Sequence, residues 1–203
     1  MYALPPSTAI SKQLYKKAIF EKFNLKTAER DRFDADISKI TLVARVSTAT
    51  VPALDEGKEN KCFYVLQVVL KRKEYDAWNI LLLQKLIPQQ MVFVLQYGEQ
   101  TQLCVFRTHL QQSEWMPAEE VEIPLLGLSL DEVWLNIVAT IGGLDSEAET
   151  TLEEQIMNRE QREKLLHQIE QMEKRCRAEK QTLRRYELHQ EILKLKKQLE
   201  GMV

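Results

Sequence analysis

The most constraining feature of the chain is a run of 57 residues, 144–200, without a glycine or a proline. Helix-forming residues dominate from about residue 147, and a continuous helix of this length would extend roughly 80 Å at 1.5 Å per residue. Intrinsic propensity alone rarely holds so long a helix rigid in water, so an apolar stripe has to be buried against another surface. The run therefore predicts a long helical segment that packs against a partner.

Apolar residues recur mostly three or four positions apart along this segment, which is the spacing of one helix face. We expect this face to make protein contacts through Leu166, Ile169, Met172, Leu183, Tyr186, Leu193 and Leu199.

Charge is divided unequally along the same segment. Residues 147–173 hold eight glutamates against three cations, whereas residues 174–203 hold nine Lys or Arg against four glutamates. Such halves pair best antiparallel, either in a hairpin that turns near residues 175–182 or between long helices of two chains. We favour two chains because no Gly, Pro or Asn lies near residue 178, although Thr182 can cap a second helix. A solvated helix, or a tail folded over its own domain, is also compatible with the pattern.

The first 143 residues alternate between helical and strand patterns. Helices are predicted at 8–23, 27–40 and 74–87, with Thr27 as the cap of the second, and a fourth follows Ser129 and ends at Gly142-Gly143. Strands are predicted at 40–47, 62–71, 90–97, 101–108 and 119–129. The segment 62–71 is apolar at nearly every position, which indicates a central strand, and Gly98 indicates a hairpin. Pro124 makes the last strand an edge strand.

These patterns predict an α+β fold. We expect a mixed sheet of about four or five strands flanked by helices, then a long charged, coiled-coil-like C-terminal helix or helical hairpin. The domains are expected at 1–143 and 144–203. Three cysteines without CxxC spacing, and no apolar run of signal-peptide or membrane-span length, favour a cytoplasmic protein.

Motifs for catalysis are weak. The sequence lacks GxGxxG, GxxxxGK[ST] and GxSxG, and we expect no cofactor, catalytic residue or metal site. A metal-dependent nuclease would need an acid two residues before Lys71, where Val69 stands, and the acids of the preceding loop are typical solvated turn residues: Asp55, Glu56 and Glu59. Cys104 lies five residues before His109, but strand alternation predicts a buried cysteine rather than a nucleophile.

Basic residues give a second, weaker interaction pattern. Lys12 and Lys16 share one face of the first predicted helix, and Lys71 follows the central strand. The tail adds Arg184, Arg185, Lys194 and Lys197. Because the net charge of the chain is −2, we expect any nucleic-acid binding by these residues alone to be weak.

Three segments carry a family resemblance: LPPSTAISKQLYKKAIFEKF, LIPQQMVFVLQY and RCRAEKQTLRRYELHQEILKLKKQLE. They resemble the start, middle and end of a bacterial family classified only as a domain of unknown function. The resemblance implies an α/β front, a charged helical end, and genes beside helicases and DNA methyltransferases in restriction-modification or phage-defence islands. It implies no catalytic residues.

The sequence and the resemblance together favour a non-enzymatic accessory subunit of such a complex. It would act through self-association of its tail, or by binding a larger partner of helicase or methyltransferase type. The alternatives are a degenerate or unrecognised metal-dependent nuclease and a nucleic-acid-binding module.

Overall fold

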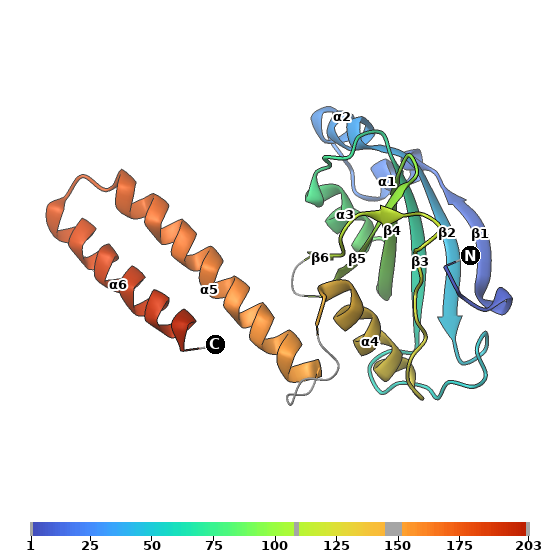
Figure 1. Ribbon diagram of the computed structural model, residues 1–203. Coiled ribbons are helices and arrows are strands. Elements are labelled where there is room, and N and C mark those ends of the chain that lie inside the picture. The colour runs from blue at the N-terminus through green and yellow to red at the C-terminus, as the bar shows by residue number, and fades with distance from the viewer. Residues whose placement is uncertain (1, 108–109, 145–151, 202–203) are drawn as a thin grey trace. The chain divides into compact units, whose positions relative to one another are not determined.

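The computed structural model describes residues 2–107, 110–144 and 152–201. The chain forms two compact units, Met1–Asp145 and Ser146–Val203. The first is an α/β unit and the second consists of helices (Figure 1). The boundary expected after Gly143 lies within two residues of this division.

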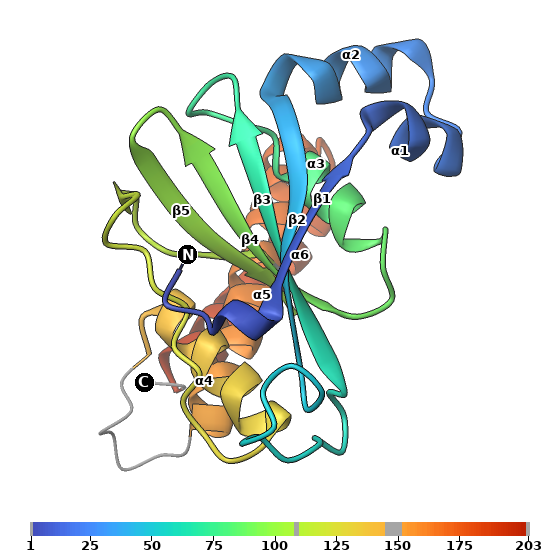
Figure 2. The ribbon, with the colours of Figure 1, turned by 90° about the vertical axis from the view of Figure 1, so that its right-hand side faces the viewer.

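Seven strands form one mixed sheet in the α/β unit, in the order β1-β2-β3-β4-β5-β6 with β7 against β5. Figure 2 shows β1 to β5 side by side. The strands are β1 (Ala9–Leu14), β2 (Ile37–Ser47), β3 (Cys62–Leu70), β4 (Gln90–Tyr97), β5 (Gln100–Phe106), β6 (Leu110–Gln112) and β7 (Met116–Pro117). The described α-helices are α1 (Lys16–Lys22), α2 (Thr27–Asp36), α3 (Ala77–Gln84), α4 (Leu130–Gly142), α5 (Leu152–Ala178) and α6 (Thr182–Glu200). None of the helices in the described ranges is long and apolar enough to cross a membrane.

The central position predicted for residues 62–71 is confirmed, because β3 lies between β2 and β4. It runs antiparallel to β2 and parallel to β4. A parallel neighbour needs a crossover connection, and α3 lies between the two strands in the chain. The predicted hairpin is also present: β4 and β5 are antiparallel, and Gly98 takes a φ of 58°, which favours glycine.

Helices cover both faces of the sheet. One set of alternate β3 side chains, including Leu66 and Val68, joins a buried cluster with Ile80 and Leu83 of α3. The other set points to the opposite face, where Phe63 contacts Trp134 of α4 with ring centroids 5.8 Å apart. The hydrophobic core of this unit therefore has two layers, one on each side of β3 and β4.

Helix α4 begins and ends as the sequence predicts. The Ser129 hydroxyl accepts a hydrogen bond from the Glu132 backbone N–H at 3.3 Å, and Gly143 ends the helix with a φ of 65°. In the first turn, Asp131 accepts hydrogen bonds from the backbone N–H groups of Lys58 and Asn60 at 2.6 and 2.8 Å. Partial burial alone would raise the pKa of Asp131, but these bonds outweigh it and lower the pKa. The ionised Asp131 carboxylate thus connects the β2–β3 loop to α4 by hydrogen bonds.

The first predicted helix is wrong over its N-terminal half. Residues 9–14 form β1, which pairs with β2 so that Lys12 lies opposite Leu42 and Leu14 opposite Ile40. Ile10 and Leu14, four residues apart, lie on one face of a helix and equally on one face of a strand. The spacing therefore fits both structures, and pairing with β2 decides between them.

Three further expectations need correction. The second helix ends at Asp36, four residues early, because Ile37 starts β2, and its N-cap is Lys26 rather than Thr27. Residues 119–129 form no strand, although Val121 and Ile123 are buried as their alternation indicates. The sheet has more strands than expected because β1, β6 and β7 were not anticipated.

The C-terminal unit is a helical hairpin formed within one chain. It is not one long helix that pairs with the same helix of a second chain, which is the arrangement that we favoured. Helices α5 and α6 are separated only by residues 179–181 and pack against each other. They run antiparallel, because Glu173 pairs with Lys196 and Cys176 lies beside Arg185. The segregation of charge correctly indicates antiparallel pairing, but the turn lies within the chain.

Candidate interaction surface

The two hairpin helices meet along an apolar seam in which residues recur at intervals of four, three and four. The seam consists of Leu165, Ile169, Met172 and Cys176 from α5, and Leu188, Ile192, Leu195 and Leu199 from α6. Ile169 is 6% exposed and Ile192 is 4% exposed, whereas the other members are half-buried. This is the spacing of helices that pack along a common stripe, and it holds the hairpin together.

The turn between the helices forms without glycine, proline or asparagine. The Glu179 side chain accepts a hydrogen bond from the backbone N–H of Gln181 at 2.9 Å. The backbone N–H of Glu179 still bonds to the Arg175 carbonyl, and that of Arg185 bonds to the Gln181 carbonyl, each at 2.9 Å. A side chain thus satisfies a donor that the turn leaves without a helical partner. A hairpin therefore forms here although the residues near 178 include no Gly, Pro or Asn.

One ion pair links the helices across the seam. Lys196 Nζ lies 2.8 Å from Glu173 Oε1, and Arg177 lies 3.4 Å from the other carboxylate oxygen. The hydrogen bond from Lys196 and its positive charge lower the pKa of Glu173. Both side chains are substantially exposed to solvent, so the pair sets the register of the helices more than it stabilises them.

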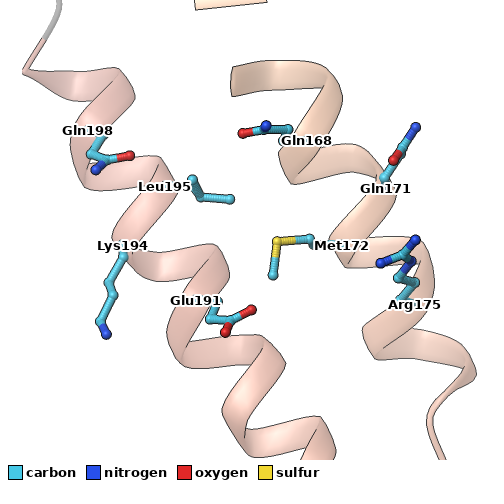
Figure 3. Close-up of a pocket in the computed structure, with 8 residues that line it drawn as sticks. All are labelled: Gln168, Gln171, Met172, Arg175, Glu191, Lys194, Leu195 and Gln198. Atoms are coloured by element: carbon cyan, nitrogen blue, oxygen red, sulfur yellow. The ribbon is translucent and has the colours of Figure 1, made fainter. Parts of the chain in front are cut away.

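A groove of about 480 Å³ lies between the two helices on one face of the hairpin (Figure 3). Met172 of α5 and Leu195 of α6 point toward one another at its base. Its sides are polar or charged and include Arg175, Glu191 and Lys194. The groove is therefore the open side of the seam, with a narrow apolar floor and charged walls.

A second apolar stripe lies on the outside of α6. Leu183 is 72% exposed, Tyr186 is 62% exposed and Leu193 is 47% exposed. At 3.6 residues per turn, these three positions fall on the side of α6 opposite to its seam residues. We call Leu183, Tyr186 and Leu193 the outer stripe. A helix that is apolar on two opposite sides can pack against two neighbours, and α5 supplies only one.

The predicted contact residues are thus divided between two environments. Ile169, Met172 and Leu199 lie in the seam, whereas Leu166 is 47% exposed and the remaining three form the outer stripe. The sequence reading missed Leu165, Leu188, Ile192 and Leu195. The repeated interval of four, three and four in each helix could have identified them. The sequence analysis instead placed all apolar residues of the segment on one common face.

A family model for a domain of unknown function, DUF4391, matches residues 3–199. The chain belongs to the DUF4391 family. Comparison with curated proteins and with solved structures found no match. The family match therefore includes both the α/β unit and nearly all of the hairpin.

Two of the basic residues proposed for nucleic-acid contacts come together in this DUF4391 chain. Lys16 Nζ lies 2.6 Å from Asp34 Oδ1, and Lys71 Nζ donates to the Asp34 backbone carbonyl. Lys12 lies on β1, so it does not share a helix face with Lys16 as predicted. Lys16 and Lys71 are engaged within the protein, which leaves them poorly placed for phosphate contacts.

The basic residues of α6 are different. Arg184, Arg185, Lys194 and Lys197 are all exposed, and none has an ion pair within the described part of the chain. Lys194 also lines the groove between the helices. These four cations are therefore available to an external partner.

The acids considered for a nuclease do not meet Lys71. Asp55, Glu56 and Glu59 precede the start of β3, whereas Lys71 follows its end. Nine strand residues separate the two ends by about 30 Å. Glu56 pairs instead with Lys61 at 3.7 Å. The described residues also contain no group of three or more His, Cys, Asp or Glu side chains arranged to hold a metal ion.

Cys104 is fully buried in the cluster around α3, as predicted. Burial raises the pKa of its thiol to about 12, despite the nearby Tyr75 hydroxyl at 3.7 Å. The thiol is therefore protonated at neutral pH and unsuited to nucleophilic attack. His109 lies outside the described residues.

Sequence reading also missed a buried carboxylate, Asp36, which has no exposed surface. It pairs with Arg72 and accepts hydrogen bonds from the Asp76 backbone N–H at 2.8 Å and the Asn79 amide at 2.7 Å. These donors come from the end of β3 and the start of α3. Through these hydrogen bonds the carboxylate holds α3 against the end of α2, which is a structural role.

Proposed function

We propose that this DUF4391 protein is a non-enzymatic accessory subunit that assembles through the outer side of its C-terminal hairpin. The observation that carries this proposal is the outer stripe of Leu183, Tyr186 and Leu193, which is exposed although the seam of the same helix is already filled. Three large apolar side chains on one side of one helix favour burial against another surface.

The occupant that fits the stripe best is a second copy of α6, running antiparallel. Two of the three stripe residues lie almost symmetrically about Gln190, Tyr186 four residues before it and Leu193 three residues after it. An antiparallel pair centred on Gln190 places Tyr186 of each copy against Leu193 of the other. Glu187 then lies near Lys194 of the other copy, which adds charge complementarity.

The wider role is proposed on the resemblance described above. A dimer joined through the hairpins leaves two α/β units free to bind a larger protein of helicase or methyltransferase type. The assembly would serve a phage-defence or restriction-modification complex in the bacterial cytoplasm. Its charged hairpin would set the register and specificity of assembly more than the affinity.

Light scattering on the purified full chain tests the assembly. We expect twice the chain mass for the unsubstituted protein, and the mass of one chain for the triple variant Leu183→Ser, Tyr186→Ser, Leu193→Ser. Met157→Ser is the matched control because Met157 is 60% exposed but lies on α5, and it should remain a dimer. A monomeric unsubstituted chain, or a dimeric triple variant, would refute self-association through the outer stripe.

A second candidate function is nucleic-acid binding by the exposed cations of α6. Arg184, Arg185, Lys194 and Lys197 favour it because they lack ion pairs in the described residues. Fluorescence anisotropy with a labelled duplex should then show affinity that falls steeply between 50 and 200 mM salt, on the order of a decade or more. Affinity that is absent, or unchanged by Arg184→Gln and Arg185→Gln, would rule this function out.

A further inference from the structure

One half of a sheet face in the α/β unit is polar. On the face covered by α4, the successive inward-pointing residues of β3 are Phe63, Val65 and then Gln67. Gln96 of β4 and its β5 partner Thr101 lie on the same face, and Gln67 Nε2 donates to Gln96 Oε1 at 2.8 Å. The apolar half packs under α4, whereas the polar half lies beyond it.

A pocket of about 340 Å³ lies over this polar half. Its floor includes Gln67, Gln96 and Thr101, and its rim includes Tyr2 together with Glu119 and Glu122. The two rim segments are tied together, because the backbone N–H of Ile123 donates to the Tyr2 carbonyl at 3.0 Å. The pocket volume falls within the range of small-ligand sites, and the pocket lies entirely within the α/β unit.

Two polar groups of the pocket, the Thr101 hydroxyl and the Gln67 side-chain carbonyl, have no hydrogen-bond partner among the described residues. Thr101 is only 2% exposed, yet its hydroxyl has no hydrogen-bond partner among the described residues. The Gln67 amide donates to Gln96, so its carbonyl oxygen is left as an acceptor. Because Gln67 and Thr101 both line the pocket, these two groups are available for hydrogen bonds to a ligand there.

The charged side chains among the described residues that line the pocket are both acidic. The described residues that line it include the carboxylates of Glu119 and Glu122 but no Lys, Arg or His. Neither glutamate has an ion pair among the described residues, and both are exposed at the rim. Tyr2 adds no charge at neutral pH, because the ordinary pKa of its phenol is 10 and burial raises the pKa further. The pocket therefore offers negative charge and oxygen acceptors without a cation to neutralise them.

We propose that this pocket binds an organic cation through a guanidinium group. Glu119 and Glu122 supply charge-assisted hydrogen bonds at the rim, and the Gln67 carbonyl and the Thr101 hydroxyl receive the remaining N–H groups below. The cation is either a free small molecule or the Arg side chain of a partner protein. The proposal is independent of assembly through the hairpin.

Isothermal titration calorimetry on the full chain tests the site with three probes. Agmatine carries a guanidinium group, N-carbamoylputrescine keeps the same primary ammonium but has a neutral urea in place of the guanidinium, and a tripeptide with blocked ends presents an arginine side chain. We expect agmatine to bind with a Kd at or below about 1 mM, and the urea analogue to bind at least about tenfold more weakly. Comparable binding of the tripeptide identifies a protein side chain as the source, whereas binding of agmatine alone identifies a small molecule.

Neighbouring glutamates provide a matched control. The double variant Glu119→Gln, Glu122→Gln should weaken binding of the preferred probe at least about tenfold. Glu120→Gln removes one carboxylate from a residue outside the pocket lining and should leave the Kd unchanged. Thr101→Val, which keeps the side-chain shape, should weaken binding a few fold. Equal binding of the urea analogue, no binding of agmatine or the tripeptide, or equal effects of the Glu120 and the double substitutions would overturn the proposal.

Discussion

The α/β unit and the hairpin bury their apolar residues to very different degrees. Among the described residues, only three of the buried hydrophobic ones belong to the hairpin: Ile156, Ile169 and Ile192. The same unit supplies five of the nine large exposed hydrophobic residues in the described ranges, namely Met157, Leu166, Leu183, Tyr186 and Leu193. A seven-stranded sheet covered on both faces forms a complete core, whereas two helices can bury only one stripe each. The α/β unit therefore buries most of its large apolar side chains, whereas the hairpin leaves a larger share of its own exposed.

The largest effect of a single substitution is expected in the core of the α/β unit. Phe93 is fully buried in β4, so Phe93→Ala should lower the free energy of unfolding by about 3–5 kcal/mol. Urea denaturation followed by tryptophan fluorescence measures this loss. Tyr97→Ala, at the exposed end of the same strand, is the control and should change stability far less. Similar losses for the two variants would contradict the two-layer core.

A smaller and local effect is expected in the hairpin seam. Ile192→Ala should lower the local unfolding free energy of α5 and α6 by about 2–3 kcal/mol, because it removes the most buried seam residue of α6. Hydrogen exchange of the backbone amides measures this quantity for each unit separately. Glu191→Ala at the adjacent exposed position should change it by less than about 0.5 kcal/mol. Loss of protection in both units for Ile192→Ala would show that the hairpin is not an independent cooperative unit.

Asp131 provides a prediction with a pH dependence. Asp131→Asn should reduce the free energy of unfolding by about 1–2 kcal/mol at pH 7, because it removes the charged acceptor for the loop N–H groups. The folded-state pKa is lowered from its ordinary value of 3.8, so the contribution is present above that pH and is lost as the pH falls through the folded pKa.

Thermal unfolding of both proteins from pH 7 to pH 2 measures this dependence. The two stability curves should converge at the acid end. Asp31→Asn, on an exposed part of α2, is the control and should follow the parent protein throughout. A gap that stays constant down to pH 2 would argue against a role for the ionised Asp131 carboxylate.

The smallest effect is expected at the exposed ion pair between the hairpin helices. Glu173→Gln should leave the thermal midpoint nearly unchanged, since exposed pairs contribute little and are screened by salt. Differential scanning calorimetry at low and high salt measures the midpoint. A clear salt-dependent decrease would show that charge, rather than the seam, holds the helices together.

Much of the fold follows from local patterns that have one interpretation. The apolar run of β3, the glycine between β4 and β5, and the Ser129 cap of α4 each favour a single structure, and all three predictions are confirmed. The spacing of Ile10 and Leu14 fits both a helix and a strand, and β6 and β7 are too short to produce a pattern. Local sequence could not resolve these cases because pairing with distant strands determines them.

The candidate sites were likewise predicted only in part. The contact residues of the tail were found in part, because helical spacing identifies apolar faces but does not show that there are two of them. The polar pocket was missed completely. Its residues come from the N-terminus, from three strands and from the segment after β7, so that only the folded sheet brings Tyr2, Gln67 and Glu122 together.

The most direct test of self-association measures disulfide cross-linking at the centre of the proposed pair. Gln190→Cys, with Cys176 replaced by Ser, should form an intermolecular disulfide under mild oxidation at least about tenfold faster than Gln168→Cys in the same background. Gln168 is the stricter control because it is more exposed but lies on α5, away from the proposed two-fold axis. Rapid formation of the Gln190→Cys dimer would support antiparallel pairing of α6 through its outer stripe. Equal rates for the two positions would contradict it.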